Sequence, residues 1–223
     1  MYIKRLNRGG KMNVIRNSNE NEMILEFLKG EIKSNRFNKD LYKVLNELNI
    51  DENIIVNGNI NKDEENKLRL NIMNKYRGYP NKELFENFPN IYEWKYAELN
   101  SNDIDKIYYI DYDYWNILSN NTSKSTIAAK VINSGKEVFD VSNKQYIDGL
   151  KYLDNNKFLP IILITCNEIK YLIIEGHLRM TVYGLDPSKL NNTYAYIGYC
   201  SIEDMKKYDI RMLEGESLNS RKY

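Results

Sequence analysis

The chain has few of the residues that usually mark a metal site, a disulfide scaffold or a membrane span. It contains one histidine, two cysteines and four prolines in 223 residues. Cys166 and Cys200 lack the CxxC spacing of zinc or redox sites, so we expect both to be thiols. No apolar run approaches the roughly 20 residues of a membrane span. The basic start Met1–Lys11 leads into charged, Asn-rich sequence instead of a signal-peptide core, so we expect a cytoplasmic protein with no membrane partner.

The two signs of charge nearly cancel. Thirty-two Lys and Arg stand against 31 Asp and Glu, a net charge of +1. This balance gives no general attraction for nucleic acid, so a nucleic-acid partner would need a local basic patch. The length is enough for a hydrophobic core without disulfides, arranged as one large domain or two small ones.

Apolar residues recur at helical spacing in the first part of the chain. Three amphipathic helices are predicted: Asn19–Lys33, about Asn38–Asn49 and about Lys62–Tyr76. Gly78 and Pro80 end the third. We therefore predict a flexible arm over residues 1–18, a helical unit over residues 19–80 and a second domain over residues 81–223. The periodicity leaves open whether the helices pack on that domain or form the interface of a homodimer.

The second part mixes strand and helix patterns, so the fold class is α+β. Tyr92–Leu99 alternates and Ile107–Ile110 is β-branched and aromatic, which predicts two strands. Ser119–Ser125 is polar enough to be a loop. The elements expected after it are a helix (Asn143–Asn155), a strand pair (Leu159–Ile164 with Lys170–Ile174), a helix (His177–Leu185) and a strand-like segment (Tyr194–Tyr199).

The strongest local motif is Glu175-Gly176-His177-Leu178-Arg179, where a buried strand breaks at a glycine directly into a helix. A helix start presents unpaired N–H groups and a partial positive charge, and an imidazole and a guanidinium can complete a phosphate clamp. His177 is the one imidazole available for acid–base chemistry. The alternative is that His177 and Arg179 form an ordinary surface pair.

This order of elements, with Gly176 and Arg179 at the turn, resembles the ParB/sulfiredoxin superfamily over about Ser125–Gly184. The resemblance implies a mixed αβ domain in which Gly176 is the turn glycine and Arg179 binds the phosphates of ATP or CTP. His177 stands where sulfiredoxins have cysteine, which argues against sulfinic-acid reduction. Leu178 replaces a usual phosphate ligand of the family. The free-serine-kinase branch, with Gly-His-His-Arg, is the most similar at the motif.

Three further positions are candidates for the same chemistry. Glu175 is suited to act as a base or to hold Mg²⁺ beside phosphates, or else it pairs with Arg179 across the turn. Asp111 and Asp113 would share one side of a strand, which fits either a two-carboxylate metal site or an exposed acidic face. Lys124, in the polar loop, would close over a nucleotide or merely belong to a connection.

The sequence thus predicts a nucleotide-binding phosphotransferase or NTP hydrolase. Its catalytic residues would be Glu175 and His177, its nucleotide-binding residues Gly176, His177, Arg179 and Lys124, and its ligands ATP or CTP with Mg²⁺. The alternative is a nucleic-acid-binding or nuclease module of a bacterial or phage defence or toxin system. A third hypothesis, based on Leu178, is an interaction domain that kept the fold and lost the ligand.

Overall fold

A mixed β-sheet of six strands runs through the part of the chain that the structure, a computed structural model, describes, residues 11–213. The strands are β1 (Asn13–Ser18), β2 (Ile91–Leu99), β3 (Ile107–Tyr108), β4 (Ile161–Thr165), β5 (Tyr171–Glu175) and β6 (Thr193–Cys200). Their spatial order is β1-β2-β6-β4-β5-β3. The β4–β6 and β3–β5 pairs are parallel, and the other neighbours are antiparallel. The α+β class is confirmed.

Helices lie on both faces of the sheet. The α-helices are α1 (Glu20–Ile32), α2 (Asn38–Leu48), α3 (Asn53–Val56), α4 (Asp63–Arg77), α5 (Asp113–Leu118), α6 (Ser125–Asn133), α7 (Lys144–Tyr152), α8 (His177–Leu185) and α9 (Ile202–Tyr208). Short 3₁₀ helices are η1 (Glu83–Phe85), η2 (Ser101–Lys106), η3 (Pro187–Leu190) and η4 (Ile210–Met212). The predicted helices correspond to α1, α2, α4, α7 and α8, with ends that differ by a few residues at most.

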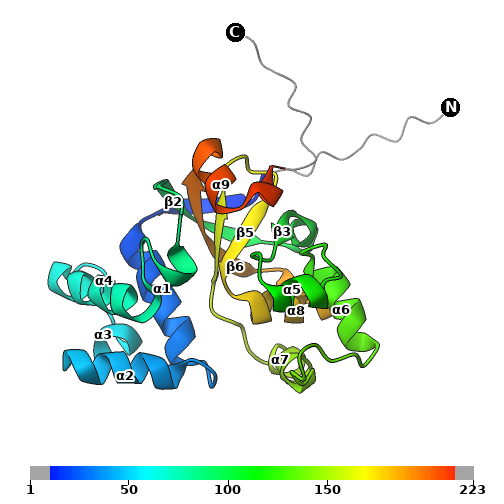
Figure 1. Cartoon of the computed structure of the whole chain (residues 1–223), viewed down its shortest axis with the longest axis horizontal. Coiled ribbons are helices and arrows are strands. Elements are labelled where there is room, and N and C mark those ends of the chain that lie inside the picture. Colours follow the sequence, from blue (N-terminus) through cyan, green and yellow to red (C-terminus); the bar gives the residue numbers. More distant parts are fainter. Residues whose placement is uncertain (1–10, 214–223) are drawn as a thin grey trace, which may run out of the picture.

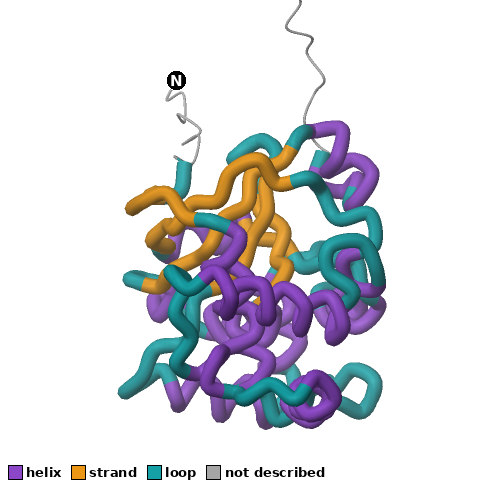
Figure 2. Tube along the Cα trace, turned by 90° about the vertical axis from the view of Figure 1, so that its left-hand side faces the viewer, coloured by secondary structure: helices purple, strands orange, loops and turns teal. Residues whose placement is uncertain are grey.

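The alternation of side chains along the central strands creates two cores. On β4, Ile161 and Leu163 pack into the core beneath α5 to α8, whereas Ile162 and Ile164 pack into the core beneath α1 to α4. The result is a helix–sheet–helix arrangement with α1 to α4 on one side and α5 to α8 on the other (Figure 1). Figure 2 views the same layers from the side of α1 to α4. The N-terminal helices thus pack on the sheet, and the homodimer stays a prediction.

The prediction of a flexible arm over residues 1–18 is wrong for residues 13–18, which form a strand. Residues 1–10 lie outside the described residues. Asn13–Ser18 forms the edge strand β1, antiparallel to β2, with Val14 opposite Ala97 and Ser18 opposite Trp94. Nearly all side chains of β1 are exposed, so the strand has no apolar alternation to predict it. Backbone hydrogen bonds to β2 hold it in the sheet.

Candidate phosphate-binding turn

Gly176 connects β5 to α8 in a conformation that favours glycine. Its φ is 106°, in the left-handed region. A Cβ at this position would lie 3.0 Å from Cγ2 of Ile161, on the neighbouring strand β4. Within residues 11–213 no side chain caps α8, so the first N–H groups of this nine-residue helix have neither an intrahelical nor a side-chain acceptor. The predicted strand–glycine–helix turn is confirmed.

Arg179 is anchored to the end of the sheet by its guanidinium. Its Nη1 donates to the carbonyl oxygens of Leu159 and Pro160, at 2.7 Å and 2.6 Å. Its Nη2 forms an ion pair with Glu175, and the two side chains are 11% and 16% exposed. Burial lowers the pKa of Arg179 to about 10, which leaves the guanidinium charged at neutral pH. The alternative in which Glu175 pairs with Arg179 is therefore what the structure contains.

Helix α1 of the N-terminal unit lies against this ion pair. A Cβ on Gly30 would lie 2.7 Å from Oε1 of Glu175 and 3.5 Å from Nη2 of Arg179. Glu26, one helical turn earlier, interacts electrostatically with Arg179. Burial raises the pKa of Glu26, and its Oε1 is buried with no hydrogen-bond partner among the described residues. The carboxylates of Glu26, Glu31 and Glu175 therefore all act on this one guanidinium. Neither Glu26 nor Gly30 was predicted for the site, although a glycine inside a helical pattern often has a packing reason.

His177 is part of an aromatic group instead of an exposed acid–base residue. Its ring stacks on Trp115 at 5.2 Å between centroids and lies 6.0 Å from the Tyr109 ring. The backbone N–H of Ile110 donates to its Nε2 at 3.5 Å. Burial lowers the pKa of His177 to about 3, so the imidazole is neutral near pH 7. In that state it adds no positive charge for a phosphate, and it is a weak base.

Lys124 makes its contacts at the other end of β5 from Gly176. Its Nζ donates to the backbone carbonyl of Asp105 and lies 3.3 Å from the centroid of the Tyr108 ring. Tyr108 pairs with Leu172, near the start of β5. Burial lowers the pKa of Lys124 to about 8. The contacts of Lys124 are thus remote from the turn, and its closing over a nucleotide stays a prediction.

The predicted strand that would carry both Asp111 and Asp113 is wrong. β3 ends at Tyr108, because the N–H of Tyr109 donates to the carbonyl of Ser123 in the distant loop. Asp113 begins α5. Asp111 accepts a hydrogen bond from Asn116 at 2.6 Å and pairs with Arg211 at 3.5 Å. Over residues 11–213 no group of three or more His, Cys, Asp and Glu side chains is placed to hold a metal ion.

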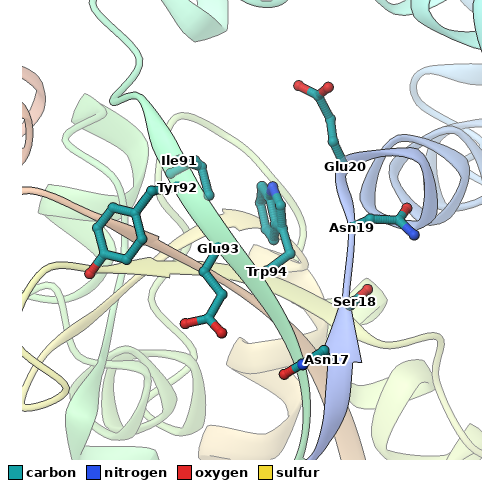
Figure 3. A pocket seen from close by; sticks show the side chains of 8 residues that line it. All are labelled: Asn17, Ser18, Asn19, Glu20, Ile91, Tyr92, Glu93 and Trp94. Atoms are coloured by element: carbon teal, nitrogen blue, oxygen red, sulfur yellow. The ribbon is translucent and has the colours of Figure 1, made fainter.

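Two surface hollows lie away from the turn. One is formed where β1 separates from β2 to enter α1, and Figure 3 shows its lining residues: Asn17, Ser18, Asn19, Glu20, Ile91, Tyr92, Glu93 and Trp94. Two of the polar side chains there make hydrogen bonds within the chain. Asn19 caps α1, and Glu20 accepts a hydrogen bond from Tyr79. The other hollow lies beside η3, between Leu153 and Thr193. Neither contains a residue predicted for the site.

Comparison with protein-family models, curated proteins and solved structures returned no match. The ParB/sulfiredoxin resemblance therefore stays a prediction. Among the helices that the structure describes, none combines the length and the apolar character that a bilayer crossing requires. The proposed function therefore rests on the geometry of the turn, which is formed by Glu175, Gly176, His177 and Arg179.

Proposed function

We propose that this chain binds the phosphates of a nucleotide at the Gly176 turn and acts as a phosphotransferase or NTP hydrolase. The observation that carries the proposal is the uncapped start of α8 behind a left-handed glycine, with a charged guanidinium from the same helix beside it. Helix N–H groups that lack acceptors favour an anion, and a nearby arginine adds a charge-assisted hydrogen bond. The resemblance to the ParB/sulfiredoxin superfamily supports ATP or CTP as the ligand.

In this proposal, phosphate binding releases Glu175 from its ion pair. Nη1 of Arg179 stays on the carbonyl groups of Leu159 and Pro160, while a phosphate oxygen replaces the Glu175 carboxylate at Nη2. The freed carboxylate then accepts the proton of the attacking water or hydroxyl group. His177, neutral and stacked on Trp115, serves as a positioning residue and not as the base.

The carboxylates at the turn make a divalent cation part of the proposal. Glu26 and Glu175 both act on the single charge of Arg179, so a bare phosphate would meet net negative charge there. Mg²⁺ bound to the phosphate oxygens would offset this negative charge, because Mg²⁺ prefers oxygen ligands and is commonly carried by substrate phosphates. We therefore expect nucleotide affinity to rise with Mg²⁺.

Arg179→Ala tests the binding step by melting-temperature shifts with ATP, CTP, GTP, UTP and ADP, each with and without Mg²⁺. A nucleotide that binds only the folded chain raises the melting temperature. Loss of a charge-assisted contact of about 1.5–3 kcal/mol should weaken binding roughly 10- to 100-fold. Arg16→Ala is the matched control, because Arg16 is also paired with a glutamate but lies on β1. Unchanged binding by folded Arg179→Ala would contradict the proposal.

Glu175→Gln separates binding from chemistry. This variant keeps Arg179 and should bind nucleotide as well as the wild type or better, while losing turnover. If no nucleotide shifts the wild-type melting temperature, the proposal is wrong, and the same turn should be tested with a single-stranded oligonucleotide. The nucleic-acid alternative requires affinity that falls steeply with salt.

A further inference from the structure

The two cysteines, far apart in the sequence, are neighbours across two central strands. β4 and β6 are parallel, with a regular register from Ile161 opposite Ala195 to Thr165 opposite Tyr199. β4 ends at Thr165, and Cys166 and Cys200 each directly follow the last residues of this register, Thr165 and Tyr199. Neighbouring strands are about 4.8 Å apart, and Cα atoms bridged by a disulfide are usually about 4.4–6.8 Å apart. The backbone therefore brings the two positions within the range of a disulfide.

The side chains also lie on the same side of the sheet. Cys200 is part of the core beneath α1 to α4, and Cys166 packs against that core. The Cys200 thiol points across the strands toward β4, where it donates to the carbonyl oxygen of Thr165 at 3.6 Å. This carbonyl group belongs to the peptide bond that joins Thr165 to Cys166. The Cys200 thiol thus lies against the peptide group that Cys166 shares with Thr165, and the two cysteines interact electrostatically.

The two thiols differ in accessibility, which assigns an order of reaction. Cys200 is 1% exposed, whereas Cys166 is only partly buried at the start of the turn between β4 and β5. Burial raises the pKa of Cys200 to about 12, and the nearby Cys166 contributes to this shift. A dissolved oxidant therefore meets Cys166 first.

We propose that Cys166 and Cys200 form a reversible disulfide across β4 and β6. With glutathione disulfide as the oxidant, the Cys166 thiolate attacks one of its sulfur atoms, and one glutathione leaves as a thiol. Cys200 then loses its proton and attacks the Cys166 sulfur, and the second glutathione leaves. Two protein thiols are oxidised to one disulfide, and one glutathione disulfide is reduced to two thiols.

The bond forms at the opposite end of β4 from the proposed nucleotide site. Ile161, which lies against Gly176, is five residues from Cys166, a distance of roughly 16 Å along the strand. The proposed disulfide is therefore remote from the Gly176 turn.

Intact-mass spectrometry tests the proposal: the full-length chain is incubated in its folded state with glutathione disulfide and is then alkylated in denaturant, so that both cysteines are accessible to the alkylating reagent. The wild type should lose about 2 Da, corresponding to two hydrogens, take up no alkylating groups, and regain both reactive thiols after dithiothreitol. A stable glutathione adduct, a disulfide-linked dimer on a non-reducing gel, or two alkylated thiols would each overturn the proposal.

Two single variants test the order of reaction. Cys200→Ala should stop at one glutathione adduct on Cys166, because the second thiol is missing. Cys166→Ser should remain unmodified while folded, because Cys200 is buried. An adduct on Cys200 in folded Cys166→Ser would overturn the order, and circular dichroism confirms folding of both variants. The increase in melting temperature caused by nucleotide should be equal in the oxidised and the reduced wild type. Failure of the disulfide proposal is then distinguishable from failure of the proposed nucleotide site.

Discussion

His177 shows how burial changes the chemistry available to one side chain. From the sequence it is the one imidazole and the natural candidate for acid–base catalysis. In the folded chain its ring stacks on Trp115, and its Nε2 accepts a hydrogen bond from the backbone N–H of Ile110. Both contacts suit the neutral ring, and burial lowers the pKa of His177 to about 3. His177 therefore contributes to the geometry of the turn, and it makes the free energy of unfolding depend on pH.

His177 should make the chain less stable as the pH falls. The unfolded imidazole takes up a proton near its ordinary pKa of about 6.5, whereas the folded one stays neutral down to about 3. Between these values the unfolded state binds more protons, so the free energy of unfolding falls with decreasing pH by at most about 1.4 kcal/mol per pH unit. Urea unfolding at pH 7, 6 and 5 should show a loss of roughly 1–2 kcal/mol from this group by pH 5.

His177→Phe is the control for this pH dependence. It keeps an aromatic ring beside Trp115 and removes the titrating group. The variant should lose the part of the pH slope that comes from the imidazole, whatever its stability at pH 7. Equal slopes for both proteins between pH 7 and pH 5 would mean that the folded imidazole is protonated there, contrary to the environment that the structure gives it.

Helix packing on both faces of the sheet depends on close backbone approaches at glycine. On one side, a Cβ at Gly184 of α8 would lie 2.4 Å from the backbone oxygen of Ser125 in α6. On the other, a Cβ at Gly30 of α1 would meet the end of the flexible Glu175 side chain at 2.7 Å. The first clash can be relieved only by moving a helix, and the second by rotating a side chain.

Gly184→Ala should therefore destabilise the chain more than Gly30→Ala. Overpacking of α8 against α6 should cost about 1–3 kcal/mol. Alanine in the interior of α1 gains up to about 1 kcal/mol of helix propensity, which offsets the displacement of Glu175. Urea midpoints of the two variants and the wild type give the comparison. Equal losses in both variants would contradict this order.

The two cores of the described residues share one sheet. Adjacent residues of β4 and β5 point alternately into the core beneath α1 to α4 and the core beneath α5 to α8. Loss of either helical layer would expose one complete side of both strands. The helical unit over residues 19–80 is thus a layer of the same core structure, and we expect both layers to unfold together.

The two tryptophans allow this to be measured, since Trp94 lies in one core and Trp115 packs against the other. Trp115→Phe leaves Trp94 as the probe of the α1 to α4 side, and Trp94→Phe leaves Trp115 as the probe of the opposite side. Within each variant, the urea midpoint from fluorescence should coincide with that from far-UV circular dichroism. A Trp94 transition at lower urea than the circular dichroism change would show that the helical unit unfolds separately.

β4, β5 and α8 could be predicted from the sequence because each of them has a clear local pattern of apolar residues. Continuous apolar runs mark the two strands, and the helical spacing after Gly176 marks the helix. Glycine at the junction fits the left-handed backbone found there. The pairing of Glu175 with Arg179, four residues apart in the chain, was likewise among the sequence-based alternatives.

The other features depend on contacts between segments that are distant in the sequence. The exposed edge strand β1 exists because β2 offers it backbone partners, and the bond from Tyr109 to Ser123 separates Asp111 and Asp113 from β3. Periodicity describes which face of an element is apolar, but not which element covers it. The order of amino acids therefore specifies the turn and its charged residues. The packing of α1 against that turn, and the parallel register of β4 with β6, arise only when the chain folds around its sheet.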